Sequence, residues 1–283
     1  SNRYKTLDMT QLPQNIGFVG AGNMASAIIG GLLSAGYDSA RLCAIDPSEA
    51  AQTKLHNLGI SEVGGQPGPT FQTSELVILA VKPQFMQAAT EGIKKHLAPE
   101  TVVMSVAAGI SVSALKDQLS NSNAPVVRCM PNTPALVGAG ASGLFASREV
   151  TDRQRAGIDA VMGVVGTTVW LEKESHIDVV TAISGSGPAY FFAFMEAMIA
   201  TGERMGLDHE TASQLTLQTA LGAAKLATQQ SDPVNELRRN VTSPGGTTER
   251  ALESFDQDNL EALVNRGMQA CLARAQEMAK EFG

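Results

Sequence analysis

Residues 16–25 read Ile-Gly-Phe-Val-Gly-Ala-Gly-Asn-Met-Ala, and this stretch decides the fold. A short apolar run is followed by Gly20, Gly22 and Ala25 at the spacing G-x-G-x-x-A, and then by a helical pattern. In that order the residues predict a β-strand, a tight turn, and a helix whose first N–H groups can bind a pyrophosphate. We therefore expect a dinucleotide site here, with a glycine turn used only for packing as the alternative.

Short apolar runs alternate with helical patterns on the C-terminal side of this turn, as far as about Val169. The alternation predicts a parallel sheet wrapped by helices, and the uninterrupted apolar character of the runs predicts strands covered on both faces. We expect an α/β fold in which a Rossmann dinucleotide-binding domain spans residues 14–174. The expected strands cover residues 16–19, 42–45, 76–81, 101–106, 126–130 and 167–171, and the expected helices cover 24–35, 49–58, 84–96, 112–119 and 152–164.

The strand signal disappears after about Ser175, and only helical patterns remain. Residues 175–283 are therefore expected to form an all-α domain, with helices over 188–205, 210–229, 234–240, 248–255 and 260–280. The helix opened by Pro188 is apolar almost all round, so it must be enclosed on several sides. We expect a partner subunit to bury this helix, which makes residues 175–283 a dimerisation domain. The alternative is that the helix is buried against the protein's own sheet domain.

The composition excludes several classes of protein. Of 283 residues, 28 are acidic and 21 are Lys or Arg, which gives a net charge of −7 and no basic run to bind nucleic acid. The three cysteines (Cys43, Cys129, Cys271) lie far apart, which argues against a disulfide framework and fits a reducing compartment. Because Glu196 interrupts the most apolar window, we expect no membrane span, and no signal peptide is visible. The four histidines have no ligand spacing, so no metal site is expected.

Residues that follow the predicted strands predict further contacts to the dinucleotide. Asp46 follows strand 42–45, where an acidic group accepts hydrogen bonds from the adenosine ribose and repels a 2′-phosphate. We therefore expect NADH to be used at least comparably with NADPH; an exposed carboxylate before the next helix is the alternative. Lys82 follows strand 76–81, and Ala107 and Ala108 follow strand 101–106, at the edge where such sheets bind ligands. For Lys82, a solvated side chain is the alternative.

The helical half holds a candidate anion site at Ser243-Pro244-Gly245-Gly246-Thr247-Thr248. Glycine-rich backbone, two hydroxyls and the N–H groups of a helix start suit a small carboxylate, whereas helix capping explains only one hydroxyl. In the loop after strand 126–130, the Asn132 amide is a candidate contact for a carboxamide or a carboxylate. The alternative is that this loop is only a rigid structural element. Neither paired carboxylates nor a Ser/His/Asp arrangement stands out, so the chemistry needs little acid–base help from the protein.

Four of these segments together resemble pyrroline-5-carboxylate reductases, and the resemblance extends from Asn15 to Lys280. It implies NAD(P)H-dependent reduction of 1-pyrroline-5-carboxylate to L-proline, the last step of proline biosynthesis, in the cytoplasm and without a metal. It also implies a helical domain that interlocks with its partner in a homodimer, and further assembly of dimers. The segments are Ala80-Val81-Lys82-Pro83, Met130-Pro131-Asn132-Thr133-Pro134, Ser184-Gly185-Ser186-Gly187-Pro188-Ala189-Tyr190 and Ser243-Pro244-Gly245-Gly246-Thr247-Thr248.

The resemblance also assigns roles to individual residues. Thr248 is expected to be the catalytic residue, with its hydroxyl near the ring nitrogen, while Glu174 matches a family position near the substrate. The family more often uses NADPH, and Asp46 departs from members with a serine-rich turn, so the cofactor preference stays open. The remaining substrate contacts are Ser243, Gly245, Gly246 and Thr247, and the cofactor contacts are Gly20, Ala21, Gly22, Asn23, Met24, Asp46, Val81, Lys82, Ala107, Ala108 and Asn240.

Two rival functions share parts of this pattern. A β-hydroxyacid dehydrogenase would use a lysine on a helix of the second domain, for which Lys225 is the candidate, but the Gly-Gly-Thr-Thr loop argues against it. A non-catalytic nucleotide sensor would need only the glycine turn, so the Ser243–Thr248 loop and Lys82 argue against that as well.

Overall fold

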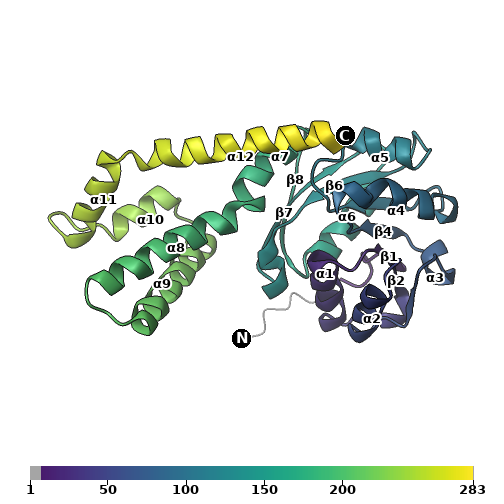
Figure 1. Cartoon of the computed structure of the whole chain (residues 1–283), viewed down its shortest axis with the longest axis horizontal. Coiled ribbons are helices and arrows are strands. Elements are labelled where there is room, and N and C mark those ends of the chain that lie inside the picture. The colour runs from purple at the N-terminus through teal and green to yellow at the C-terminus, as the bar shows by residue number, and fades with distance from the viewer. Residues whose placement is uncertain (1–7, 283) are drawn as a thin grey trace. The chain divides into compact units, whose positions relative to one another are not determined.

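The computed structural model describes residues 8–282 (Figure 1). Eight strands in this range form one sheet, in the order β3-β2-β1-β4-β5-β6-β7-β8. Strands β1 to β6 are parallel, whereas β7 is antiparallel to β6 and β8 is parallel to β7. The order 3-2-1-4-5-6 is that of dinucleotide-binding sheets, so the predicted Rossmann fold is confirmed. The strands are β1 (Ile16–Val19), β2 (Leu42–Ile45), β3 (Glu62–Gly64), β4 (Leu76–Leu79), β5 (Val102–Ser105), β6 (Val126–Met130), β7 (Gly140–Ala146) and β8 (Gly166–Trp170).

Helices cover both faces of this sheet, and successive strand residues point to opposite faces. In β4, for example, Leu76 and Ile78 join the core on one side, while Val77 and Leu79 join the core on the other. Both cores are apolar, which explains why the strands are continuous apolar runs. On one side lie α1 (Asn23–Ser34), α2 (Glu49–Asn57) and α6 (Asp152–Met162), and on the other lie α3 (Pro69–Gln72), α4 (Met86–Ile93) and α5 (Val112–Gln118).

Two strands are absent from the sequence prediction. β3 is three residues long and only half-buried, so it lacks an apolar run. β7 is rich in Gly, Ala and Ser, a composition that indicates a loop rather than a strand. Its glycines serve close packing, because a Cβ at Gly143 would lie 2.8 Å from the Val180 side chain of α7 (His176–Val180).

The described chain forms two compact units. One comprises the chain up to Ser186 together with the segment from Cys271 onward, and the other comprises residues 187–270. The sequence places residues 175–186 and the last helix in the helical half, whereas here α7, the π-helical turn Thr181–Gly185 and the end of α12 pack within the sheet unit. The remaining helices are α8 (Gly187–Arg204), α9 (His209–Gln229), α10 (Val234–Asn240), α11 (Thr247–Gln257) and α12 (Leu260–Phe282).

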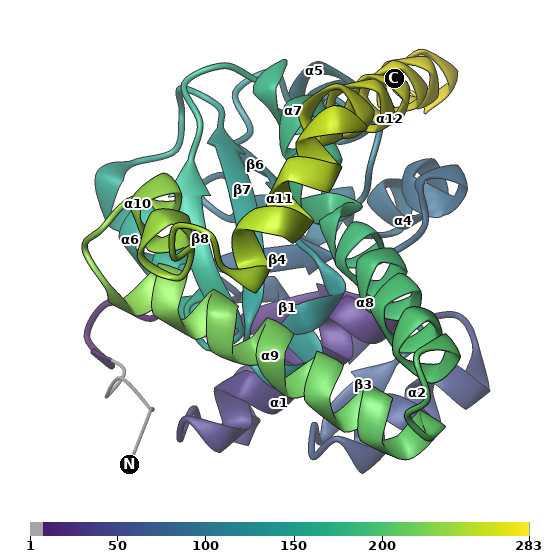
Figure 2. The same ribbon diagram turned by 90° about the vertical axis from the view of Figure 1, so that its left-hand side faces the viewer.

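In the second unit, α8 packs against α9 (Figure 2). Much of the apolar surface of α8 stays exposed. Phe194 meets Phe255 of α11 edge-to-face at 6.3 Å between ring centroids, yet Phe191 and Phe192 are 69% and 56% exposed. We expected no membrane span, but by length and composition alone the run His176–Arg204, which contains an 18-residue window with a mean hydropathy of 1.2, could cross a membrane. It is the only such helix among residues 8–282.

Candidate active site

Gly20 forms the tight turn at the end of β1. Its φ is +100°, a conformation that favours glycine, and a Cβ there would lie 2.4 Å from the Ala80 carbonyl oxygen. Its N–H donates to the Ile45 carbonyl at 2.9 Å, which ties the turn to the end of β2. The fold alone therefore requires glycine at this position.

Gly22 is different, because nothing among residues 8–282 requires glycine there. Its φ of −69° and ψ of 176° suit any residue, and a Cβ at this position would lie no closer than 3.7 Å to its nearest neighbour, the Ala80 carbonyl oxygen. Gly22 is the N-cap of α1, and no side chain caps that helix start. An uncapped helix start behind a backbone without a Cβ is the arrangement that a pyrophosphate needs. Ala21, Asn23 and Met24 lie on the same turn.

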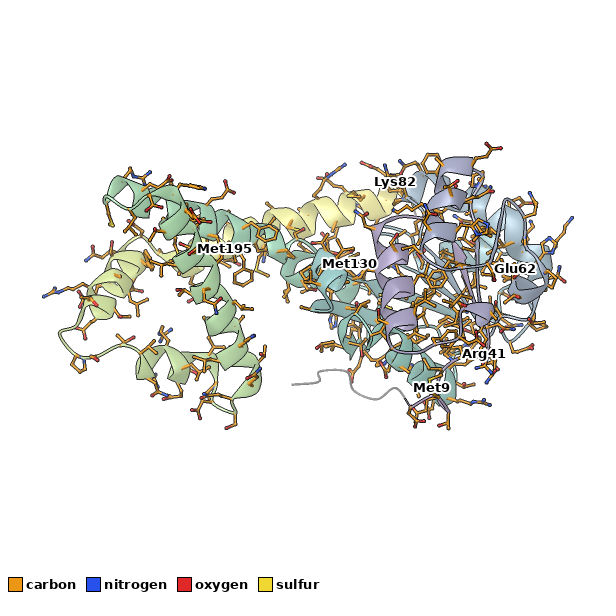
Figure 3. The ribbon with its side chains drawn as sticks, turned by 90° about the horizontal axis from the view of Figure 1, so that it is seen from below. Met9, Arg41, Glu62, Lys82, Met130 and Met195 are labelled. Atoms are coloured by element: carbon orange, nitrogen blue, oxygen red, sulfur yellow. The ribbon has the colours of Figure 1, made fainter. Side chains whose placement is uncertain are left out.

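The other expected cofactor residues of the sheet unit follow the carboxyl ends of neighbouring strands. Asp46 follows β2, Val81 and Lys82 follow β4, and Ala107 and Ala108 follow β5. The strand ends are held together by backbone hydrogen bonds, such as those from the Ala80 N–H to the Val19 carbonyl at 2.8 Å and from the Val106 N–H to the Leu79 carbonyl at 3.1 Å. Lys82, labelled in Figure 3, is exposed at this edge.

Asp46 and Lys54 set the charge around the adenosine side of this turn. The Asp46 carboxylate accepts a hydrogen bond from the Ser48 N–H at 2.9 Å through one oxygen, which fixes the orientation of its side chain. Lys54 of α2 donates from Nζ to the Ala21 carbonyl at 2.9 Å. Sequence reasoning missed Lys54, because only the packing of α2 brings this exposed lysine to the phosphate turn.

Glu174 lies against the start of α5. Its Oε1 accepts hydrogen bonds from the Val112 N–H at 2.7 Å and from Nη1 of Arg128 at 3.1 Å. Sequence reasoning also missed Arg128, which stands inside the apolar strand β6. The Asn132 side chain accepts a hydrogen bond from the Ala141 N–H at 2.8 Å, in accord with the alternative of a rigid structural loop.

The expected substrate residues other than Glu174 lie together in the second unit, at the turn that leads into α11 and at the start of that helix. Gly245 has φ +72°, and the Gly246 N–H donates to the Ser243 carbonyl at 2.9 Å. Gly246 is the N-cap of α11, again without a side-chain cap, so the first N–H groups of the helix are available to an anion. Thr247 is exposed and Thr248 is half-buried, while Asn240 ends α10 a few residues earlier.

No group of three or more His, Cys, Asp or Glu side chains that could hold a metal ion occurs within residues 8–282. The arrangement thus offers two uncapped helix starts as anion sites, one in each unit. It also offers a hydroxyl at Thr248.

Comparisons with known proteins identify the family. Residues 174–278 match the model of the pyrroline-5-carboxylate reductase dimerisation family, and residues 15–109 match that of coenzyme F420-dependent NADP oxidoreductases. The chain is 46% identical over 268 residues to a pyrroline-5-carboxylate reductase of Pseudomonas aeruginosa, covering 95% of this chain and 98% of the relative. The chain belongs to the pyrroline-5-carboxylate reductase family. A relative from Pasteurella multocida is 42% identical, with 95% of this chain and 99% of the relative covered.

Solved structures of the family have the same fold. A pyrroline-5-carboxylate reductase from Coxiella burnetii superposes with a TM-score of 0.90 at 38% identity, covering 94% of this chain and 98% of that one. A Plasmodium falciparum pyrroline carboxylate reductase with NADP bound gives a TM-score of 0.79 at 27% identity, with coverages of 94% and 98%. Membership makes the chain an NAD(P)-dependent oxidoreductase. The expected activity, reduction of 1-pyrroline-5-carboxylate to L-proline in proline biosynthesis, is the activity of this family.

Proposed function

We propose that this chain reduces 1-pyrroline-5-carboxylate to L-proline in the cytoplasm, with the dinucleotide on the turn after β1 and the substrate carboxylate on the turn before α11. The observation that carries the proposal is Gly22, whose lack of a side chain is explained neither by its backbone conformation nor by packing against any described residue. A pyrophosphate at the uncapped start of α1 accounts for it. The free thiols of Cys43, Cys129 and Cys271 fit a reducing compartment.

The cofactor residues would contact different parts of the dinucleotide. Gly20 to Met24 would hold the pyrophosphate, and Asp46 would accept the ribose hydroxyls with the carboxylate oxygen that Ser48 leaves available. Val81, Lys82, Ala107 and Ala108 would border the nicotinamide half, and Asn240 would contribute from the helical unit. Since Asp46 opposes a 2′-phosphate, we expect NADH to serve at least comparably with NADPH, although Lys54 beside Ala21 moderates that charge.

The substrate residues supply binding and orientation rather than an acid–base pair. The N–H groups at the start of α11 would bind the carboxylate, with Ser243 and Gly245 to Thr247 shaping the turn. The protonated cyclic imine is already electrophilic, so the Thr248 hydroxyl needs only to hold the ring nitrogen by a hydrogen bond. Holding two reactants aligned can lower the activation barrier by roughly 7–11 kcal/mol. When bound, the reduced nicotinamide supplies the hydride.

A second copy of the chain would cover the exposed apolar side chains of α8. Phe191 and Phe192 lie in the segment matched by the dimerisation model, and surfaces of this kind mark protein interfaces. This cover explains the apolar character of the run His176–Arg204 without a membrane. We propose a homodimer, with further assembly of dimers.

The test is the oxidation of NADH and of NADPH, each with and without 1-pyrroline-5-carboxylate. The proposal expects oxidation that depends on the imine, with kcat/KM for NADH at least comparable to that for NADPH. A hundredfold preference for NADPH would overturn the role of Asp46, and no oxidation with either nucleotide would overturn the proposed function.

A further inference from the structure

The loop between β5 and α5 carries Ala107 and Ala108, and several contacts hold it in place. The Ser105 hydroxyl accepts a hydrogen bond from the Ala107 N–H at 3.2 Å. Gly109 has φ +79°, and a Cβ there would lie 3.2 Å from the Met278 carbonyl oxygen, so the end of α12 packs directly on the loop. The backbone positions of Ala107 and Ala108 are therefore determined by their neighbours.

Glu174 anchors the far end of this loop. Val112 is the first residue of α5, and its N–H would otherwise be one of the unpaired donors of a helix start. Glu174 accepts that N–H at 2.7 Å, while the N-cap Ser111 accepts the Ala114 N–H at 3.0 Å. The carboxylate therefore fixes the point at which the loop becomes helix.

Arg128 holds Glu174 in turn. It lies on β6 opposite Ser105 in the strand register, so it stands beside the residue that fixes Ala107. Its side chain is only 8% exposed, and its Nη1 lies 3.1 Å from Glu174 Oε1. The Arg128 Nε is buried and has no hydrogen-bond partner among the described residues. Because burying a charge is costly, the ion pair with Glu174 has to offset that cost.

We propose that Glu174 is a positioning residue, which with Arg128 sets the loop that borders the nicotinamide, rather than a substrate contact. The inference rests on the proposed function, because it takes Ala107 and Ala108 as the border of the nicotinamide half. Its direct consequence is that loss of the Glu174–Val112 hydrogen bond weakens binding of the nicotinamide end of the cofactor alone. The phosphate turn at Gly20 to Met24 connects β1 to α1, whereas the hydrogen bonds of Glu174 run to α5 and β6.

Another ion pair on the same helix provides the control. Lys116 of α5 pairs with Glu149 at 2.8 Å, and the two side chains are 17% and 16% exposed. Glu149→Ala removes a comparably buried ion pair from α5 without touching the loop. A purely structural role for Glu174 therefore predicts the same changes in both variants.

Two variants remove the proposed contact by different routes. Glu174→Ala deletes the acceptor. Val112→Pro deletes the donor and leaves the Glu174–Arg128 pair intact. This variant should fold, because proline suits the first position of a helix. Ser111 already has the extended ψ of 160° that a following proline requires. Glu174→Gln retains an acceptor for Val112 and removes only the charge.

The experiment measures the Kd of NADH and of ADP-ribose, which lacks the nicotinamide ring, for each purified full-length variant by calorimetry, together with its Tm. We expect Glu174→Ala and Val112→Pro to raise the Kd of NADH about fivefold, the effect of one net hydrogen bond, and to leave that of ADP-ribose within about twofold. Glu149→Ala should lower Tm and change neither Kd.

Equal changes for Glu174→Ala and Glu149→Ala, or an unchanged Kd for NADH in Val112→Pro, would overturn the inference. An unchanged Kd for NADH with a raised KM for the imine in Glu174→Gln would instead make Glu174 a substrate contact. A wild-type protein that binds neither NADH nor NADPH would refute the proposed function itself, which separates the two failures.

Discussion

Replacing Gly22 with Ala separates the requirements of folding from those of binding. The backbone there is extended, with φ −69° and ψ 176°, and the nearest atom to a new Cβ is 3.7 Å away. Alanine can adopt this conformation without strain, so the free energy of unfolding should stay unchanged or rise by about 0.4–1 kcal/mol. The same methyl group would stand where the pyrophosphate approaches the backbone, so the Kd of NADH and of ADP should rise at least about tenfold, or about 1.4 kcal/mol.

Two other glycines of the same segment are matched controls. Gly30 lies within α1 with no atom within 4 Å of a Cβ, so Gly30→Ala should stabilise the protein by about 0.5–1 kcal/mol and leave both Kd values unchanged. Gly20→Ala should destabilise it by at least about 2 kcal/mol, since φ is +100° and the Cβ would overlap the Ala80 carbonyl.

The measurements are chemical denaturation of the three variants and calorimetric titration with NADH and ADP. Retention of wild-type affinity by a folded Gly22→Ala variant would refute the placement of the pyrophosphate. A large loss of stability in that variant would instead show that packing explains the glycine.

Three further predictions concern catalysis, acid stability and thiol reactivity. Thr248→Ala should lower kcat/KM for 1-pyrroline-5-carboxylate by at least about tenfold, because it removes a hydrogen bond to a charged group. The Kd of NADH should stay nearly unchanged. Turnover within twofold of wild type would exclude the catalytic role of Thr248. The hydrogen bond from Lys116 lowers the pKa of Glu149 to about 2, so its stabilisation is fully present above the ordinary value near 4.5 and is lost as the pH falls toward 2. Glu149→Gln should therefore cost about 1–2 kcal/mol in urea unfolding at neutral pH and progressively less below pH 4.5, and a pH-independent difference would contradict this. Burial raises the pKa of the Cys43 and Cys129 thiols to about 12, so neither should react with a disulfide reagent in the native protein, and rapid labelling of either, located by peptide mapping, would contradict the packing.

The Rossmann fold was predictable because its central strands lie between two apolar cores. Ile16 and Phe18 face one core and Val19 the other, so three of the four residues of β1 carry an apolar signal. β7 carries no such signal, because Gly143 must stay small where Val180 packs on it. Its glycines therefore reflect a tertiary contact that the local sequence does not reveal.

The residues of the candidate site also differ in whether the local sequence predicts their positions. Gly20 and Gly22 form a contiguous motif whose spacing encodes the turn, so their positions follow from the sequence. Lys54 is 33 residues from Ala21, and Glu174 is 46 residues from Arg128, so only the fold brings these pairs together. The resemblance predicts that Glu174 lies near the substrate, and this stays a prediction; its hydrogen bonds in the structure run to the start of α5 and to β6.

The sequence also did not predict that the end of α12 packs within the sheet unit. Helix α12 has one apolar stripe, and the pattern does not say which partner each part of it meets. Its end packs on Gly109, and Phe282 joins the core beneath α4 and α5. The order of segments in the chain therefore does not reveal this division into compact units.

Isotope transfer tests the central claim most directly. NADH carrying deuterium at the transferable position of nicotinamide C4 is incubated with the protein and 1-pyrroline-5-carboxylate, and the product is analysed by mass spectrometry and NMR. The account predicts L-proline that carries the deuterium at C5, formed in step with nucleotide oxidation. Proline without deuterium at C5, or nucleotide oxidation without proline, would contradict it.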